Sequence, residues 1–202
     1  MAYTTIDDAS LYFRVKTYTG NSTNNTAITW DETHANMQPD WLWLKQRTTA
    51  NQEHWLADSV RGAGLFLESN SGVAEADGTS GFDSFDTNGF TVDDSARTNR
   101  GTMVGWGWKA GTSFTNDASS TGVGTIDSTG TINTTAGFSV ISYTGTGSAG
   151  TIAHGLGVVP RMVITKNRDH GSSGLQDWCV YHPRVGSDGA VFLNLTNTKD
   201  TH

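Results

Sequence analysis

The sequence has little of several features on which common protein classes depend. Its 202 residues include 3 Pro and one Cys, 16% of them are charged, and the net charge is −7. With Cys179 as its single cysteine, the chain forms no internal disulfide. A basic stripe is missing, which argues against nucleic-acid binding, because phosphate neutralisation needs clustered Lys and Arg. No apolar run reaches the roughly 20 residues of a membrane helix, so we predict no membrane insertion.

Motifs of enzymes and metal centres are also missing. The chain contains no HExxH, no Walker loop, no cysteine-based zinc spacing and no arrangement typical of a Ser-His-Asp triad. Its acidic loops match no EF-hand pattern. We therefore predict that the protein is not an enzyme and uses no cofactor and no metal. A pair of catalytic carboxylates on distant strands leaves no local trace, so a capsular depolymerase stays open as a third hypothesis.

The residues that are abundant favour β-structure. There are 24 Gly and 7 Trp, with many Thr, Ser and Asn, and no segment shows a convincing 3.6-residue apolar period. Thr and aromatic residues are enriched in strands, while Gly, Asn and Ser are enriched in tight turns. The sequence therefore predicts an all-β fold.

A loose internal repeat divides the chain. The block Phe13-x-Val15-x-x-Tyr18-Thr19-Gly20 returns as Phe138-x-Val140-x-x-Tyr143-Thr144-Gly145. Further landmarks return in the same order: Pro39, Lys45 and Arg47 as Pro160, Lys166 and Arg168; Trp55 and Arg61 as Trp178 and Arg184; Leu65–Leu67 as Val191–Leu193. Repeats of this kind indicate duplicated structural units. We predict tandem antiparallel β-sandwiches, the second incomplete.

The repeat and the composition set the expected boundaries. Residues 1–11 are an N-terminal arm, either a helical turn capped by an Asp or an extended strap. Residues 12–110 hold about seven strands of a first sandwich, with a long loop at 69–88. Residues 111–136 are a Gly/Ser/Thr-rich linker with a small hairpin across Ser128–Gly130. Residues 137–202 are a truncated second sandwich without counterparts of Phe90 and Trp106, so either the polypeptide continues beyond His202 or another segment supplies the missing strands.

Candidate binding residues come from cations and tryptophans at repeated positions. Residues two apart in a strand share a face, which groups Lys45 with Arg47 and Lys166 with Arg168. These cations form either a groove for an acidic or hydroxylated ligand or a set of ordinary salt bridges. Trp106 and Trp108 alternate with glycines, whose flat face is either open to a ligand or filled by neighbouring bulky side chains. The candidate ligand-binding residues are Lys45, Arg47, Arg61, Trp106, Trp108, Lys166, Arg168 and Arg184. Cys179, which replaces Leu56 in the repeat, is expected to be a buried small hydrophobe.

Several segments together resemble a known family. They are Tyr3–Phe13, Pro39–Arg47, Asp58–Gly62, Val104–Gly111, Gly137–Gly145 and Thr151–Gly157. They resemble a repeated module in virion proteins of marine tailed bacteriophages. The resemblance implies concanavalin-like or jelly-roll sandwiches in a tail-fibre or appendage protein on the virion exterior, with other virion proteins as partners. It also implies a homo-oligomer, and trimers are common in phage fibres, although no coiled-coil heptad is present here.

Two functions follow as hypotheses. In the first, the protein attaches the virion to host surface polysaccharide, because sugar rings stack on aromatic side chains and repeated modules give avidity. In the second, it is a capsid decoration, head-fibre or tail scaffold protein that binds only other virion proteins.

Overall fold

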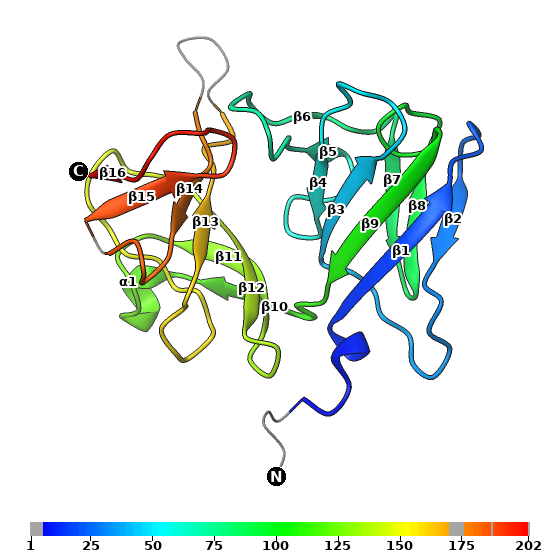
Figure 1. Cartoon of the computed structure of the whole chain (residues 1–202). Helices are drawn as coiled ribbons and strands as arrows, with labels where there is room; N and C mark the ends of the chain where they lie inside the picture. Colours follow the sequence, from blue (N-terminus) through cyan, green and yellow to red (C-terminus); the bar gives the residue numbers. More distant parts are fainter. Residues whose placement is uncertain (1–5, 170–175, 187, 202) are drawn as a thin grey trace.

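The computed structural model describes residues 6–169, 176–186 and 188–201, and these residues are almost entirely β-strands and turns. Figure 1 shows two groups of sheets side by side, which we call the first half (residues 6–110) and the second half (residues 111–201). Every strand pair within the named sheets is antiparallel. The predicted all-β, antiparallel fold is confirmed, while the jelly-roll connectivity stays a prediction.

Two facing sheets build the first half. One has the order β1-β9-β3-β4, with β1 at Phe13–Thr19, β9 at Thr102–Trp108, β3 at Trp41–Gln46 and β4 at Trp55–Asp58. The other has the order β2-β8-β7, with β2 at Thr26–Thr29, β8 at Gly89–Val92 and β7 at Phe82–Asp86. A short pair, β5 (Leu65–Phe66) and β6 (Ala76–Asp77), lies beyond β4, and Leu67 bridges to Leu56.

A core of apolar side chains fills the space between these two sheets. One sheet contributes Leu42, Leu44, Trp55 and Ala57, and the other contributes Ile28, Phe82, Phe90 and Val92. Two of the inward positions on β9 are glycines: a Cβ on Gly105 would lie 2.9 Å from Leu44 Cδ2, and one on Gly107 would lie 2.7 Å from Trp30 Cζ2. Neighbouring bulky side chains therefore fill the glycine face, which is the second of the two readings offered by the sequence.

Strand β1 reverses the usual arrangement, in which apolar side chains point into the core and polar side chains point to solvent. Arg14 is almost completely buried, and its guanidinium donates to Ser10 O (2.7 Å), Ala35 O (2.8 Å) and Asn88 Oδ1 (3.1 Å). Its neighbours Phe13 and Val15 point to the outer face of the sheet. A buried cation is tolerated because backbone carbonyls and an amide satisfy its donors.

The second half also has two sheets. The first has the order β10-β11-β12, with β10 at Thr112–Asn116, β11 at Ser128–Asn133 and β12 at Phe138–Tyr143. The short helix α1 (Ala118–Thr121) follows β10, with Asp117 as its N-cap. The other has the order β13-β14-β15-β16, with β13 at Val163–Thr165, β14 at Cys179–Tyr181, β15 at Gly189–Phe192 and β16 at Asp200–Thr201.

Four expectations need correction. The segment 111–136, expected to be a linker, contributes β10, α1 and β11, and the expected hairpin across Ser128–Gly130 is wrong because Ser128–Asn133 is one continuous strand. Thr and Ser form strands readily once neighbours pair with them, so a composition poor in large residues did not mean a linker. The expected loop at 69–88 contains β6 and β7. Cys179 is half-buried rather than buried.

Of the two forms left open for the N-terminal arm, the structure has the helical turn, η1 (Ala9–Leu11), with Asp8 as its N-cap.

The blocks of the repeat lie on corresponding strands. Their positions match β1 with β12, β3 with β13, β4 with β14, and β5 through Leu67 with β15. The neighbour order β13-β14-β15 repeats that of β3, β4 and Leu67. One register differs: Leu42 pairs with Ala57, whereas Val163 pairs with Tyr181, the counterpart of Asp58. A one-residue slip exchanges the two faces of a strand.

The slip explains the different surroundings of two matched tryptophans. Trp55 lies in the first-half core and stacks on Phe66, with ring centroids 3.9 Å apart. Trp178 instead packs against Leu56 and Leu67 of the first half, and its indole N–H donates to Glu68 O at 2.7 Å. The same residue type at the same place in the repeat thus serves a core in one half and a contact between halves in the other.

Candidate functional site

The outer face of the sheet β1-β9-β3-β4 carries rows of aromatic side chains. The pairing registers place Phe13, Trp108 and Trp41 in one cross-strand row, and Val15, Trp106 and Trp43 in the next. The Phe13 and Trp41 ring centroids lie 4.7 and 4.6 Å from that of Trp108. Aromatic pairs across strands stabilise a sheet and keep their rings in fixed orientations. We call this surface the aromatic face.

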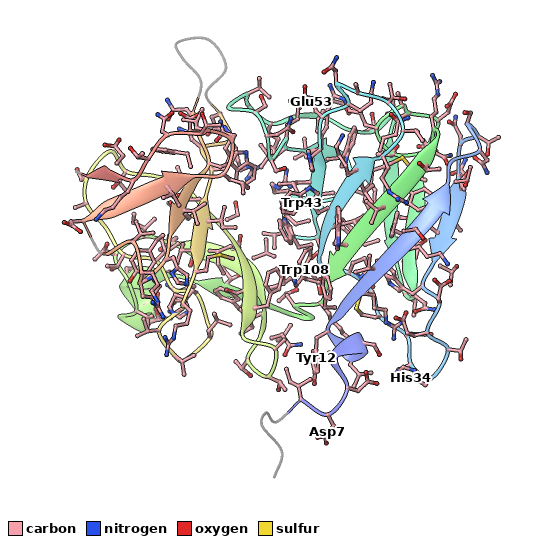
Figure 2. The ribbon with its side chains drawn as sticks, viewed as in Figure 1. Asp7, Tyr12, His34, Trp43, Glu53 and Trp108 are labelled. Carbon is pink, nitrogen blue, oxygen red and sulfur yellow. The ribbon has the colours of Figure 1, made fainter. Side chains whose placement is uncertain are left out.

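Part of the aromatic face joins the two halves. The Phe138 ring centroid lies 6.1 Å from that of Trp41 and 6.4 Å from that of Trp108. Beside them, Trp41, Trp43 and Ile164 pack against the cluster of Leu56, Leu67 and Trp178. In Figure 2, Trp43 and Trp108 lie on the side of the sheet that faces the second half. The area toward β3 and β4 is therefore an internal contact.

The area toward β1 stays open to solvent. Phe13 is 36% exposed and Val15 42% exposed, while Trp106 and Trp108 are half-buried. We call these four residues the aromatic ledge. Lys45 lies in the next row, which contains Thr17 and Val104. An apolar strip with a cation at its end is a surface on which a polar molecule with one apolar face can lie.

His54 fixes the orientation of one tryptophan beside the ledge. The Trp43 indole N–H donates to His54 Nδ1 at 2.7 Å, and Lys45 Nζ donates to Gln52 O at 2.6 Å. Burial lowers the pKa of His54, and nearby Lys45 lowers it further, while Glu53 acts in the opposite direction. Since Nδ1 accepts the hydrogen bond, the neutral ring carries its proton on Nε2.

A cluster of ion pairs forms a second contact between the halves. Glu75 accepts from Arg61 Nη1 at 2.9 Å and from Arg168 at 2.9 Å (Nε) and 2.7 Å (Nη2). Arg61 Nε also donates to Asp58 Oδ2 at 2.5 Å, and Arg168 Nη1 donates to Ser142 Oγ at 3.1 Å. We call this cluster the junction ion pairs. Paired guanidinium groups of this kind hold a carboxylate in a fixed geometry.

Electrostatics in the junction favour the charged pair. Burial raises the pKa of Glu75, but hydrogen bonds from Arg168 and Arg61 outweigh it, so the pKa lies below its ordinary value. Nearby, Lys166 Nζ donates to Gly72 O at 3.1 Å, and burial lowers the pKa of Lys166 although Asp177 raises it. Charged side chains of both halves are thus engaged in contacts within the molecule.

The structure separates the predicted binding residues into three groups. Lys45, Trp106 and Trp108 lie together on the aromatic face, and exposed Arg47 follows the end of β3. The junction uses Arg61, Lys166 and Arg168. Arg184 is exposed in the turn after β14, where its backbone N–H donates to His182 Nδ1 at 3.2 Å. The predicted cations therefore do not form one groove.

Some residues of the face escaped sequence reasoning. Phe13 and Val15 were seen only as marks of the repeat, and Phe138 as the counterpart of Phe13. The alternation of Phe13 and Val15 with Arg14 indicated that this strand has two different faces, but not which face the rest of the protein covers. The sequence gave no signal that His54 binds Trp43 or that Glu75 binds Arg168, because these partners lie on another strand or in the other half.

A serine, a histidine and an aspartate meet near the N-terminus without forming a catalytic triad. Asp8 Oδ2 lies 2.6 Å and Ser10 Oγ 3.1 Å from the same ring nitrogen, Nε2 of His34. In a triad the two partners bind opposite ring nitrogens, so that the carboxylate orients the base. Asp8 also caps η1 through Ser10 N. These contacts tie the arm to the loop after β2.

Two of the surface hollows lie in or beside the second half. One, of about 350 Å³, is lined by Ala110, Thr112 and residues 132–135. The other, of about 250 Å³, lies between β10, β11 and β12, and its Asp117 and Asp127 already accept backbone N–H groups of α1. Within the described ranges, no group of three metal-ligating side chains occurs, and no helix there has the length and apolarity to cross a membrane.

Comparison with known proteins gives one match. No curated protein and no solved structure is significantly similar to the chain. A family described as a domain of unknown function, DUF7483, matches residues 8–202, a range that includes both halves, the aromatic face and the junction ion pairs. The chain belongs to the DUF7483 family.

Proposed function

We propose that this protein is a structural component of a bacteriophage particle, carried on a tail fibre or another external appendage, that attaches to host surface glycans through the aromatic ledge. The proposal for a virion protein is supported by the resemblance of its segments to a repeated phage module. The proposal for glycan binding is supported by the ledge itself, and it is this surface that carries the function.

The chemistry of the ledge suits a sugar better than other ligands. A pyranose ring has an apolar face of C–H groups that stacks on an aromatic ring, and hydroxyl groups around its rim that need hydrogen-bond partners. Phe13, Trp106 and Trp108 offer the apolar surface. Lys45 and Arg47 supply donors at its end. A shallow, rigid platform of this type binds weakly, and several copies on one particle would raise the overall affinity through avidity.

A glycan array with the full chain, followed by titration calorimetry with the best polysaccharide, tests the proposal. We expect binding that Trp106→Ala weakens about tenfold or more, since aromatic residues dominate contact energies at such surfaces. Tyr143→Ala, an exposed aromatic change on β12, is the matched control and should leave the affinity unchanged. No binding to any host polysaccharide, or equal loss in both variants, contradicts glycan attachment by the ledge.

The second candidate function is a decoration or scaffold protein that binds only other virion proteins. The observation that favours it is that several large apolar side chains of the second half are exposed, among them Val158, Val159, Met162 and Leu195. Where exposed apolar side chains adjoin, they are typical of protein contacts. Release of reducing sugar from a bound polysaccharide would instead support the depolymerase hypothesis.

A further inference from the structure

In the first half, two strands pair with the same central strand between them. Their counterparts in the second half each have an unpaired edge instead. In the first half, β9 lies between β1 and β3 and pairs with both along its whole length. The counterparts of β1 and β3 are β12 and β13. Within the described residues, β12 pairs only with β11, and β13 pairs only with β14. The second half therefore has the two flanking strands of this arrangement without the central one.

A side chain on one of these strands is exposed where its counterpart is buried. Leu42 on β3 is completely buried in the core between the two sheets of the first half, whereas its counterpart Val163 on β13 is 38% exposed. Val163 thus lacks the cover that the first half provides for Leu42.

Other contacts place the two strands near one another. Arg168, just after β13, donates to Ser142 Oγ on β12 at 3.1 Å. Phe138 on β12 contacts Trp41, and Ile164 on β13 packs against the cluster that includes Trp41. Both strands therefore lie over the same part of the aromatic face, and Figure 1 shows them as neighbours.

We propose that the second half binds an extended polypeptide segment as an added β-strand between β12 and β13. An unpaired strand edge presents backbone N–H and C=O groups that a second strand satisfies along its length. A small molecule or a helix cannot pair with both edges in this way.

The first half indicates the chemistry of the segment. On β9, Val104, Trp106 and Trp108 point outward between the side chains of the flanking strands, and small residues alternate with them. In the second half the side chains at the matched positions are Phe138 and Ile164, which pack against the first half. The segment is therefore uncharged, with aromatic or large apolar residues at alternate positions and small residues between them.

A folded second copy of this chain does not meet this requirement. Its own β9 is held between β1 and β3, with its glycines against Leu44, Phe90 and Trp30. Releasing that strand would open the first-half core. The occupant is a free segment that has no folded sheet of its own.

The probe is a labelled peptide with the sequence of residues 101–108, which contains β9, added to the full chain. We expect saturable binding in fluorescence anisotropy and about tenfold slower hydrogen exchange at backbone amides of β12 and β13, without change in β1 and β3. A peptide of the same composition in scrambled order should not bind. A fusion of residues 76–109 to the C-terminus through a flexible linker should protect the same amides, and it covers the case in which the free peptide is insoluble.

A pair of charge substitutions makes the test specific. Val163→Asp places a charge at the proposed edge and should weaken the peptide about tenfold, the effect of roughly 1.4 kcal/mol. Val123→Asp, the same change at a more exposed valine before β11, is the control and should have no effect. Hydrogen exchange in the first-half core reports whether each variant is folded.

Three outcomes would overturn the proposal. They are no protection of β12 and β13 by either the peptide or the fusion, equal binding of the scrambled peptide, and a concentration-dependent dimer that protects these amides without any peptide. The last outcome would assign the surface to a second copy of the chain. None of them depends on whether the aromatic ledge binds glycans.

Discussion

The two halves use similar strands but differ in what covers them. In the first half, the sheet β2-β8-β7 lies against β1-β9-β3-β4 and completes a core of large apolar side chains. The described residues contain one other buried apolar cluster, and it lies between the halves. The residue pattern therefore predicts where a strand forms, but a core forms only where a second sheet packs against the first.

The second half depends on the first for its best-buried contact. Trp178 is the bulkiest buried side chain described in the second half, and it packs on Leu56 and Leu67. The junction ion pairs add a polar contact beside it. We infer that the second half gains much of its stability from the aromatic face and the junction, so the two halves should respond differently to substitution.

The largest expected effect comes from matched truncations. Leu42→Ala removes a fully buried side chain and should lower the free energy of unfolding by about 2 to 5 kcal/mol, because it leaves a cavity. Val163→Ala, at the matched exposed position, should cost less than about 1 kcal/mol. Denaturant unfolding followed by tryptophan fluorescence measures both. Equal costs would show that β13 is as well covered as β3.

A smaller effect should come from the junction. Glu75→Gln removes the carboxylate shared by Arg61 and Arg168, of which Arg61 is nearly buried. We expect a loss of roughly 2 to 3 kcal/mol, at or below the usual cost of breaking a buried ion pair because Asp58 still binds Arg61. Hydrogen exchange should rise in β13 and β14 before it rises in β3 and β9.

The control for the junction is an exposed pair of the first half. Asp94→Asn breaks the ion pair with Arg100, which is open to solvent, and should change stability little. Uniform destabilisation of both halves by Glu75→Gln would contradict a separate role for the junction.

The smallest expected effect is a pH dependence at the aromatic face. Because the pKa of His54 lies below the ordinary 6.5, the unfolded chain binds its proton more readily. This contribution to stability is complete above pH 6.5 and is lost as the pH falls through the lowered pKa of the folded state. Protonation also removes the acceptor for the Trp43 indole N–H, so tryptophan fluorescence should change in the same range. The change should be absent in His54→Gln, and its persistence there would assign it to another group.

Sequence reasoning predicted the first half better than the second. Residues 12–110, expected to hold the strands of a first sandwich, contain β1 to β9, and the Trp-Gly alternation at 105–108 lies on β9. The strands within residues 111–136 were not predicted, because a segment of Thr, Ser and Gly has too few large side chains to mark a strand. Pairing of β10 with β11, and of β11 with β12, decides that these strands form. For the candidate site, the sequence named Lys45 and the tryptophans Trp106 and Trp108 separately, and the structure brings them to one surface. For Arg61 and Arg168 the sequence left open a groove or salt bridges, and the structure has the salt bridges.

Local sequence determined what depends on neighbours along the chain: the all-β class, the turns, and the repeat of Phe, Pro, Lys and Trp landmarks in both halves. Only the tertiary structure decided which face of each strand is covered. A one-residue slip in register sends Trp178 to the junction while Trp55 enters a core, and Glu75 finds Arg168 across 93 positions of sequence. Such choices are set by contacts between distant segments, whose energies no local pattern contains.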